Sequence, residues 1–193
     1  MKKRIIISAA AFALAAVVGV GIFVSWSGNE KEIQYLSASW SYNYSGIEEL
    51  SVSSDLIALV KVSGIEDTVI EVGIPYTTFA VEVVTPVYNT VEGDRFTIYM
   101  TGGETEDKVV EIADDPLLQV GDEILVFCKE NPDGTYQILS GSQGRLVYED
   151  GKLNSLNAMD TRIAQANVYN NVKVANADAE TLIAEIKGYV KAE

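Results

Sequence analysis

Histidine is absent from this chain of 193 residues, and cysteine occurs only once. The lack of histidine excludes Ser–His and Cys–His nucleophiles, histidine-ligated zinc and the usual general base near neutral pH. A single cysteine excludes an intramolecular disulfide. The motifs Ser-x-x-Lys and Gly-x-Ser-x-Gly and the phosphate-binding loop do not occur either. We therefore predict a protein that is not an enzyme and has no catalytic, cofactor-binding or metal-binding residues.

Basic residues are scarce as well, with 14 against 28 acidic residues, and three of the 14 are Lys2, Lys3 and Arg4. The rest of the chain holds 11 basic and 28 acidic residues, which gives it a net charge of −17. Such a surface repels the phosphates of nucleic acids and has few cations to displace their counterions. It also disfavours spreading over anionic lipid. We therefore expect no nucleic-acid partner.

One hydrophobic run is long: residues 5–26 are 22 positions without a charge. A helix of that length spans the roughly 30 Å hydrocarbon core of a bilayer. The basic residues before it favour a cytoplasmic N-terminus. Residues 1–27 are therefore predicted to be a signal-anchor, which makes the chain a single-pass protein of the cell membrane with an extracellular domain.

A cleaved signal peptide is the alternative. No Ala-x-Ala follows the apolar run, but Ser25-Trp26-Ser27 has the small-x-small pattern that would allow cleavage before Gly28 and secretion. Both interpretations place the remaining chain outside the cytoplasm. An apolar core helix of a cytosolic protein is the third and least favoured interpretation.

Residues 28–50 are predicted to be a juxtamembrane linker, and residues 51–153 a domain of short strands. The linker contains four aromatic residues that we expect to pack on the domain, with an exposed sticky patch or envelope-facing strip as the alternative: Tyr35, Trp40, Tyr42 and Tyr44. Strand patterns cover residues 55–63 (ending at Gly64), 76–85, 95–101, 109–112, 123–129, 135–139 and 145–148. About seven short strands without long helical patterns between them predict a mainly β sandwich or small barrel.

Three features between or within these strands have a structural interpretation. The glycine-rich residues 140–144 are expected to form a flexible corner. The acidic residues 104–107 and Asp114-Asp115 are expected to be solvated surface loops, with Ca²⁺ binding left open as an alternative. Cys128 ends an apolar run, which predicts a buried, inert thiol rather than a redox or catalytic one.

Residues 154–193 are predicted to be a C-terminal extension with a helix at about residues 177–191. Asn176 or Asp178 can cap this helix. Four apolar residues then recur at helical spacing: Leu182, Ile183, Ile186 and Val190. We interpret this stripe as a lid packed on the barrel, and a partner-binding helix is the alternative. Residues 154–175 carry no clear pattern.

The order of segments resembles a domain common in uncharacterised exported surface proteins of Gram-positive bacteria. The segments that carry the resemblance are residues 54–57, 76–79, 81–83, 102–103, 116–127, 133–136 and 141–144. Their order is also similar to that of the netrin-like domain of metalloproteinase inhibitors, and both resemble OB-type five-stranded barrels. The resemblance implies a small OB-like barrel, closed or partly open. The inhibitors' N-terminal metal-chelating cysteine and their disulfides have no counterpart here.

These features favour a non-enzymatic, membrane-tethered binding module outside the cell, with a protein or an envelope glycan as its partner. Four tyrosines in or beside strands are candidates for an aromatic ligand platform, although half-buried structural roles are the more common ones: Tyr76, Tyr88, Tyr99 and Tyr136. An inhibitor of an extracellular protease is the first alternative. A hydrolase that uses two carboxylates about 5–9 Å apart is the second.

Mass spectrometry of the native protein tests the predicted anchor. The expected result is an intact N-terminus, because the apolar run is longer than the hydrophobic region of a usual signal peptide. A mature chain that begins at Gly28 would contradict a retained anchor and would show that the domain is released.

Overall fold

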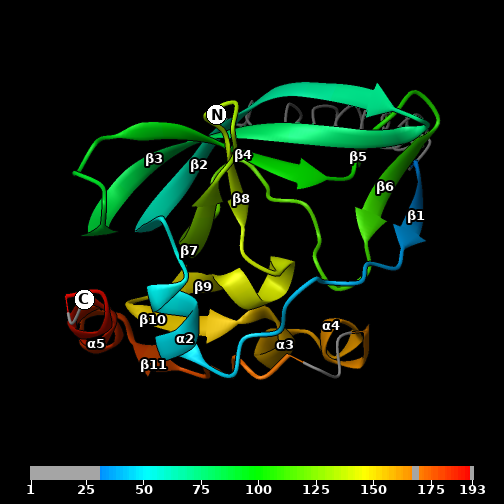
Figure 1. The fold of residues 1–193 in the computed structure, drawn as a ribbon. Coiled ribbons are helices and arrows are strands. Elements are labelled where there is room, and N and C mark those ends of the chain that lie inside the picture. Colours follow the sequence, from blue (N-terminus) through cyan, green and yellow to red (C-terminus); the bar gives the residue numbers. More distant parts are fainter. Residues whose placement is uncertain (1–30, 167–169, 192–193) are drawn as a thin grey trace, which may run out of the picture. The chain divides into compact units, whose positions relative to one another are not determined.

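The computed structural model describes residues 31–166 and 170–191 (Figure 1). The predicted anchor, residues 1–27, lies outside the described residues. Across the two described ranges, no helix combines the length and the apolar character that a membrane crossing requires. Residues 33–193 make up one compact unit.

Five strands of this unit close into a small barrel. They are β2 (Leu56–Glu71), β3 (Ile74–Tyr88), β4 (Arg95–Thr101), β7 (Glu123–Glu130) and β8 (Tyr136–Ile138). Neighbouring strands pair in the order β7-β2-β3-β4-β8, and β8 closes the barrel by pairing with both β4 and β7. The predicted mainly β fold and its small closed barrel are therefore confirmed, and the barrel is compatible with an OB-like fold.

The remaining elements extend or cover the barrel. The sheet continues from β7 through β9 (Arg145–Glu149), β10 (Lys152–Ser155) and β11 (Ala177–Asp178). A second sheet has the order β1-β6-β5 and contains β1 (Glu32–Leu36), β5 (Gly103–Glu104) and β6 (Lys108–Ile112). The helices are α2 (Ile47–Val52), α3 (Leu156–Met159), α4 (Thr161–Ala166), α5 (Ala179–Tyr189) and the 3₁₀ helix η1 (Gly141–Gly144).

Residues 56–60 of β2 and residues 124–128 of β7 are buried on both faces of the sheet. Alternate residues of β2, such as Ala58 and Val60, point into the barrel, and those between them, such as Ile57 and Leu59, point into a second core. Strand β7 divides its side chains in the same way. Two-sided burial explains why both strands are continuous apolar runs in the sequence, whereas β3 alternates.

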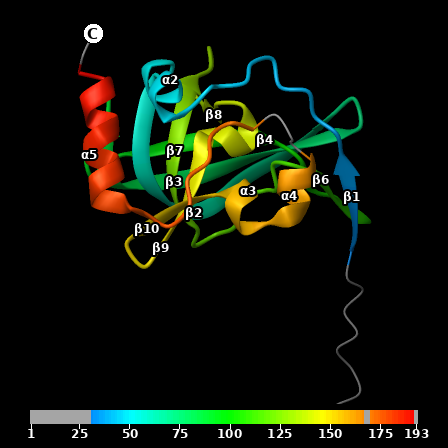
Figure 2. The ribbon, with the colours of Figure 1, turned by 90° about the horizontal axis from the view of Figure 1, so that it is seen from below.

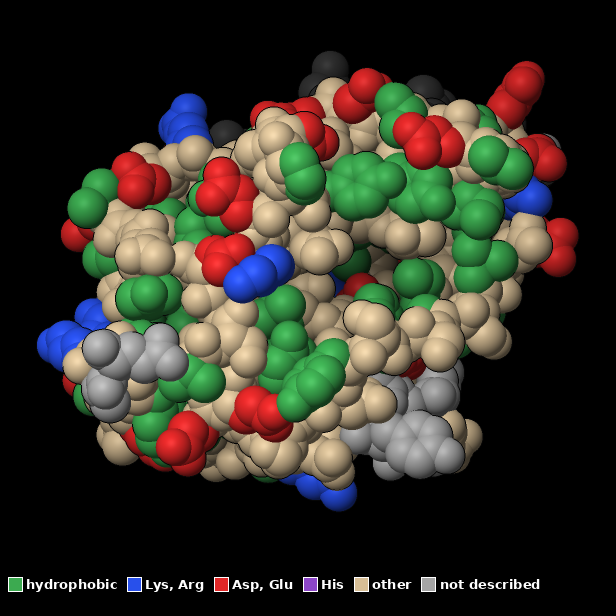
Figure 3. Space-filling model, viewed as in Figure 1, with side chains coloured by type: hydrophobic (Ala, Val, Ile, Leu, Met, Phe, Trp, Pro, Cys, Tyr) green, Lys and Arg blue, Asp and Glu red, His purple; other side chains and the backbone are tan. Residues whose placement is uncertain are grey.

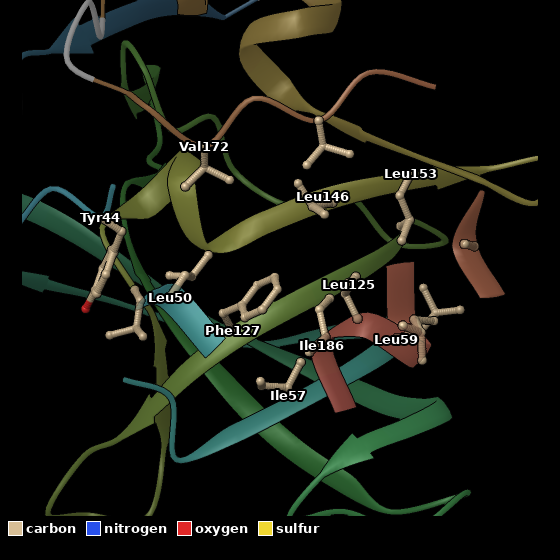
Figure 4. Close-up of a cluster of buried hydrophobic side chains, with 14 residues drawn as sticks. Tyr44, Leu50, Ile57, Leu59, Leu125, Phe127, Leu146, Leu153, Val172 and Ile186 are labelled. Carbon is tan, nitrogen blue, oxygen red and sulfur yellow. The ribbon is translucent and has the colours of Figure 1, made fainter. Parts of the chain in front are cut away.

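Helix α5 covers the second core. Figure 4 shows Ile186 of α5 among Ile57, Leu125 and Phe127 from the central strands. The helix begins after Asp178, whose carboxylate accepts a hydrogen bond of 3.1 Å from the Thr181 backbone N–H. The predicted C-terminal helix, its cap and its packing as a lid are confirmed. Helix α2 lies beside α5 (Figures 1 and 2).

The turn before α2 is held by Glu49. One of its carboxylate oxygens accepts hydrogen bonds from the backbone N–H and the hydroxyl of Ser45, at 2.8 and 2.7 Å. The other accepts a hydrogen bond from the Tyr42 hydroxyl. These donors, the Tyr42 hydroxyl above all, lower the pKa of Glu49 to about 2.

The first long strand does not end at Gly64, as the sequence pattern predicts. Strand β2 continues to Glu71 through irregularities at Val62/Gly64 and Ile65/Asp67, so the glycine lies within a bulged strand. The turn that does end β2 contains Val72 and Gly73, both with positive φ, at 50° and 82°. A β-branched residue is rare in that conformation, which is why the sequence gives little signal for this turn.

The variant Ile186→Ala tests the packing of α5. Because Ile186 is fully buried in the second core, we expect the free energy of unfolding to fall by about 2–5 kcal/mol. Urea unfolding of the full-length protein measures the change. The matched control is Val91→Ala at an exposed position, with an expected change within about 0.5 kcal/mol. Equal effects of the two substitutions would contradict the packing described above.

Candidate functional site

Buried polar side chains gather around η1. All four residues of η1 are buried, so the predicted flexible corner at residues 140–144 is wrong. Gly141 has a φ of 56°, and a Cβ atom there would clash with the Trp40 ring and lie 2.9 Å from Cγ of Asp115. A Cβ atom on Gly144 would meet the Leu139 carbonyl oxygen. The two glycines therefore allow this loop to pack tightly instead of loosening it.

An ion pair lies beneath this loop. Nη2 of Arg145 is 2.9 Å from Oδ1 of Asp115, and the two side chains are only 4% and 8% exposed. Oδ1 of Asp115 accepts no hydrogen bond, so the attraction between the two side chains at this contact is electrostatic. The same Nη2 donates a hydrogen bond to the Pro116 carbonyl oxygen. A buried charge of this kind depends on its partner, because removing one member leaves the other unpaired.

Asp114 and Asp115 do not form the solvated loop that their sequence predicts. Both are buried, at 5% and 6% exposure. Oδ2 of Asp114 accepts a hydrogen bond of 2.8 Å from Nε1 of Trp40. Burial raises the pKa of Asp115 above its ordinary value, the positive charge of Arg145 opposes the rise, and the charge of Asp114 adds to it.

The segment around Trp40 fastens onto the same loop. The Tyr44 backbone N–H donates to Oε1 of Gln143 at 3.0 Å, and the Ser140 hydroxyl donates to the Tyr42 carbonyl oxygen at 2.6 Å. Tyr44 itself is buried in the second core. Of the four aromatic residues expected to pack on the domain, Trp40 and Tyr44 do so, whereas the side chains of Tyr35 and Tyr42 are exposed.

A groove with a volume of about 740 Å³ opens next to Arg145. It lies where the pairing of β7 with β9 ends, at Ile124 and Val147. Its apolar lining residues are Pro116, Leu117, Leu118, Ile124, Val147 and Leu156. Its acidic lining residues are Asp122, Glu123, Glu149 and Asp150. Neither Asp114 nor Asp115 lines it, so Arg145 is the one member of the ion pair that reaches the groove.

The four tyrosines predicted as a platform divide between three places. Tyr76 and Tyr99 stack with ring centroids 5.3 Å apart and planes 14° from parallel. Tyr136 packs edge-on against Phe96 beside the barrel core, and Tyr88 packs against the second core. The structure therefore brings together two of the four.

Cys128 lies in the barrel core, where burial raises the pKa of its thiol. Among residues 31–166 and 170–191, no three cysteine and carboxylate side chains are grouped in a way that could hold a metal ion. No family model matches the sequence, and no curated protein or solved structure is significantly similar to it.

The residues that form the groove and the ion pair carry little signal in the sequence. Arg145 is one of the few basic residues of the domain and directly follows the glycine-rich loop, which is the one feature that could have drawn attention to it. Its partner, Asp115, lies 30 positions earlier, among many other acidic residues. Sequence pattern alone does not bring such a pair together.

The variant Arg145→Met tests the ion pair through its pH dependence. The pKa of Asp115 is higher in the folded state than in the unfolded state. Its contribution to stability is therefore largest at a pH below the unfolded-state pKa, and it is lost as the pH rises through the folded-state pKa. Loss of Arg145 raises that pKa further. We expect unfolding free energy to fall by about 3–5 kcal/mol at about pH 7, and by less at about pH 4.

The double variant Asp115→Asn/Arg145→Met is the control. It removes both charges, so we expect it to recover most of the stability that the single variant loses at about pH 7. Urea unfolding at both pH values measures these differences. An equal loss at the two pH values, or no recovery in the double variant, would show that the pair is not electrostatically coupled.

Proposed function

We propose that this chain is a non-enzymatic binding module, held outside the cell membrane by residues 1–27, and that the groove beside Arg145 binds a cationic segment of a partner protein. The charge of the groove is the observation that supports the proposal. Four carboxylates line it, and Arg145, the basic lining residue in the part of the chain that the structure describes, is already paired with Asp115.

The acidic side chains are available to a ligand to different degrees. Glu123 makes a surface ion pair with Lys61 at 3.0 Å, and a carboxylate oxygen of Asp122 accepts a hydrogen bond from the Gln119 backbone N–H. Glu149 and Asp150 lie at the end of β9 and in the β9–β10 turn, whereas Asp122 directly precedes β7 and Glu123 begins it. Carboxylates contributed by both segments favour a cation in the groove, and charge complementarity of this kind speeds encounter and selects the partner.

The floor of the groove favours a protein segment over a glycan. Aliphatic side chains of the 116–124 segment and of β9 line it, and among the described residues Tyr148 is the one aromatic side chain in the lining. Sugars usually bind against exposed aromatic rings, whereas leucine and valine side chains bury the aliphatic side chains of a protein. An extended segment that alternates basic and aliphatic residues matches both the rim and the floor.

Peptide binding by the full-length protein in neutral detergent tests this proposal. We expect a peptide of alternating lysine and leucine to bind, and one of alternating glutamate and leucine not to bind. The double variant Glu149→Gln/Asp150→Asn should weaken binding by about five- to tenfold, because each removed charge is a partly exposed contact. Isothermal calorimetry at low and high salt measures the affinity.

The matched control for that variant is Glu92→Gln, an exposed carboxylate in the loop between β3 and β4 that should leave the affinity unchanged. Equal binding of the two peptides, or equal effects of the groove and control variants, would contradict the proposal. Micromolar inhibition of secreted metalloproteases by the same protein would instead favour the inhibitor alternative.

A further inference from the structure

A second surface lies on the outer face of β3 and β4. Thr77 and Phe79 of β3 and Ile98 of β4 are buried toward the barrel, so Tyr76 and Tyr99 point to the opposite face. In the strand register Tyr76 faces Thr101, and Tyr99 faces Thr78, which makes the two tyrosines diagonal neighbours on that face. Their stacked rings are half-buried, so part of each reaches the surface.

The same face continues onto β2. Val69 lies opposite Tyr76 in the β2–β3 pairing, so its side chain points to the same side, where it is 42% exposed. We call the three residues Val69, Tyr76 and Tyr99 the tyrosine platform. Figure 3 shows apolar and acidic side chains next to one another in the upper part of the view, where Figure 1 places the β2–β3 hairpin.

Acidic residues surround the tyrosine platform. Glu71 follows Val69 by two positions on β2 and therefore points to the same face. Oε2 of Glu66 accepts a hydrogen bond of 2.9 Å from the Thr97 hydroxyl, two residues before Tyr99. Burial raises the pKa of Tyr99, and its electrostatic interactions with Tyr76, Glu71 and Asp133 raise it further.

Two basic residues on this face are already paired. Lys61, which lies opposite Glu82 in the β2–β3 pairing, has its ammonium group 3.0 Å from the Glu123 carboxylate. Arg95 lies at the other end of β4, where its guanidinium contacts the Glu82 carboxylate at 2.7 Å. The platform thus combines two near-parallel aromatic rings with an excess of negative charge. Cations bind over aromatic faces, and a guanidinium group can stack on a ring while its N–H groups donate to a carboxylate.

We propose that the tyrosine platform binds an arginine side chain of a protein partner, with the guanidinium plane against the tyrosine rings and its N–H groups directed to Glu71 or Glu66. This site is separate from the groove, which is formed by the 116–124 loop and β9. A partner can therefore meet the domain at two independent points. The inference stands whether or not the groove binds its proposed ligand.

The test uses the full-length protein in neutral detergent and three short peptides that differ at one position: acetyl-Gly-X-Gly-amide with arginine, lysine or citrulline as X. Citrulline has nearly the shape of arginine but no charge, and lysine has the charge without the planar group. We expect the arginine peptide to shift the NMR signals of the Tyr76 and Tyr99 rings, with affinity decreasing from arginine to lysine to citrulline.

Variants locate the response. Tyr99→Leu should weaken binding of the arginine peptide by about two- to fivefold, and Tyr99→Phe, which keeps the ring, should bind nearly as the native protein does. The double variant Glu66→Gln/Glu71→Gln should weaken it by a similar factor without altering a buried residue. Tyr35→Leu, an exposed tyrosine on β1, is the matched control and should have no effect.

Several results would overturn the proposal. Equal shifts with citrulline and arginine would show that charge is irrelevant, and unchanged affinity in the double glutamate variant would show the same. Stronger ring shifts with an oligomer of N-acetylglucosamine would assign the platform to a glycan instead. If the groove variant Glu149→Gln/Asp150→Asn abolished the ring response, the peptide would be bound at the groove and not at the platform.

Discussion

The pairing of β2 with β7 is the contact on which the rest of the domain depends. Six residue pairs join the two strands, from Leu56 with Cys128 to Lys61 with Glu123. Each strand contributes one set of side chains to the barrel interior and the other set to the core beneath α2 and α5. Side chains of both cores therefore come from the same pair of hydrogen-bonded strands. Apolar burial on two sides also protects those bonds from water, which makes this pair the expected centre of stability.

The two surfaces proposed for binding form where this framework ends. The groove opens where β9 separates from β7, and the 116–124 loop beside it is fixed by Arg145, by the Asp115 ion pair and by the hydrogen bond from the Gly121 N–H to the Val62 carbonyl. The tyrosine platform lies on the outer side of the barrel wall, whose inner side is packed with Phe79 and Ile98. The side chains proposed to contact a ligand thus lie on or next to rigid strands in both the groove and the tyrosine platform. Acidic residues at the turns give both surfaces their negative charge.

Much of this fold follows from local pattern. The alternation in β3, the apolar runs of β2 and β7, and the stripe and Asp178 cap of α5 each express burial or hydrogen bonding that acts within a few residues. The errors occur where contacts between distant segments override local preference. Charged residues are normally exposed, so Asp114 and Asp115 indicate a surface loop until Trp40 and Arg145 are placed against them. Gly64 indicates the end of a strand in the same way, because a bulge depends on the strands around it, and Val72 gives no signal for the turn that ends β2. For the candidate site, the sequence indicates the acidic charge and the four tyrosines. It does not show which tyrosines stack on one another or which acidic residues line the groove.

Native-state hydrogen exchange on the full-length protein tests most directly the claim that the β2–β7 pair holds both cores and thereby both surfaces. We expect the amides of residues 57–60 and 125–127 to exchange slowest, at a rate set by global unfolding, while the amides of α5 and of the β2–β3 turn exchange through smaller openings. If the central amides exchanged as fast as those of α5, the β2–β7 pair would not be the common support of the two cores.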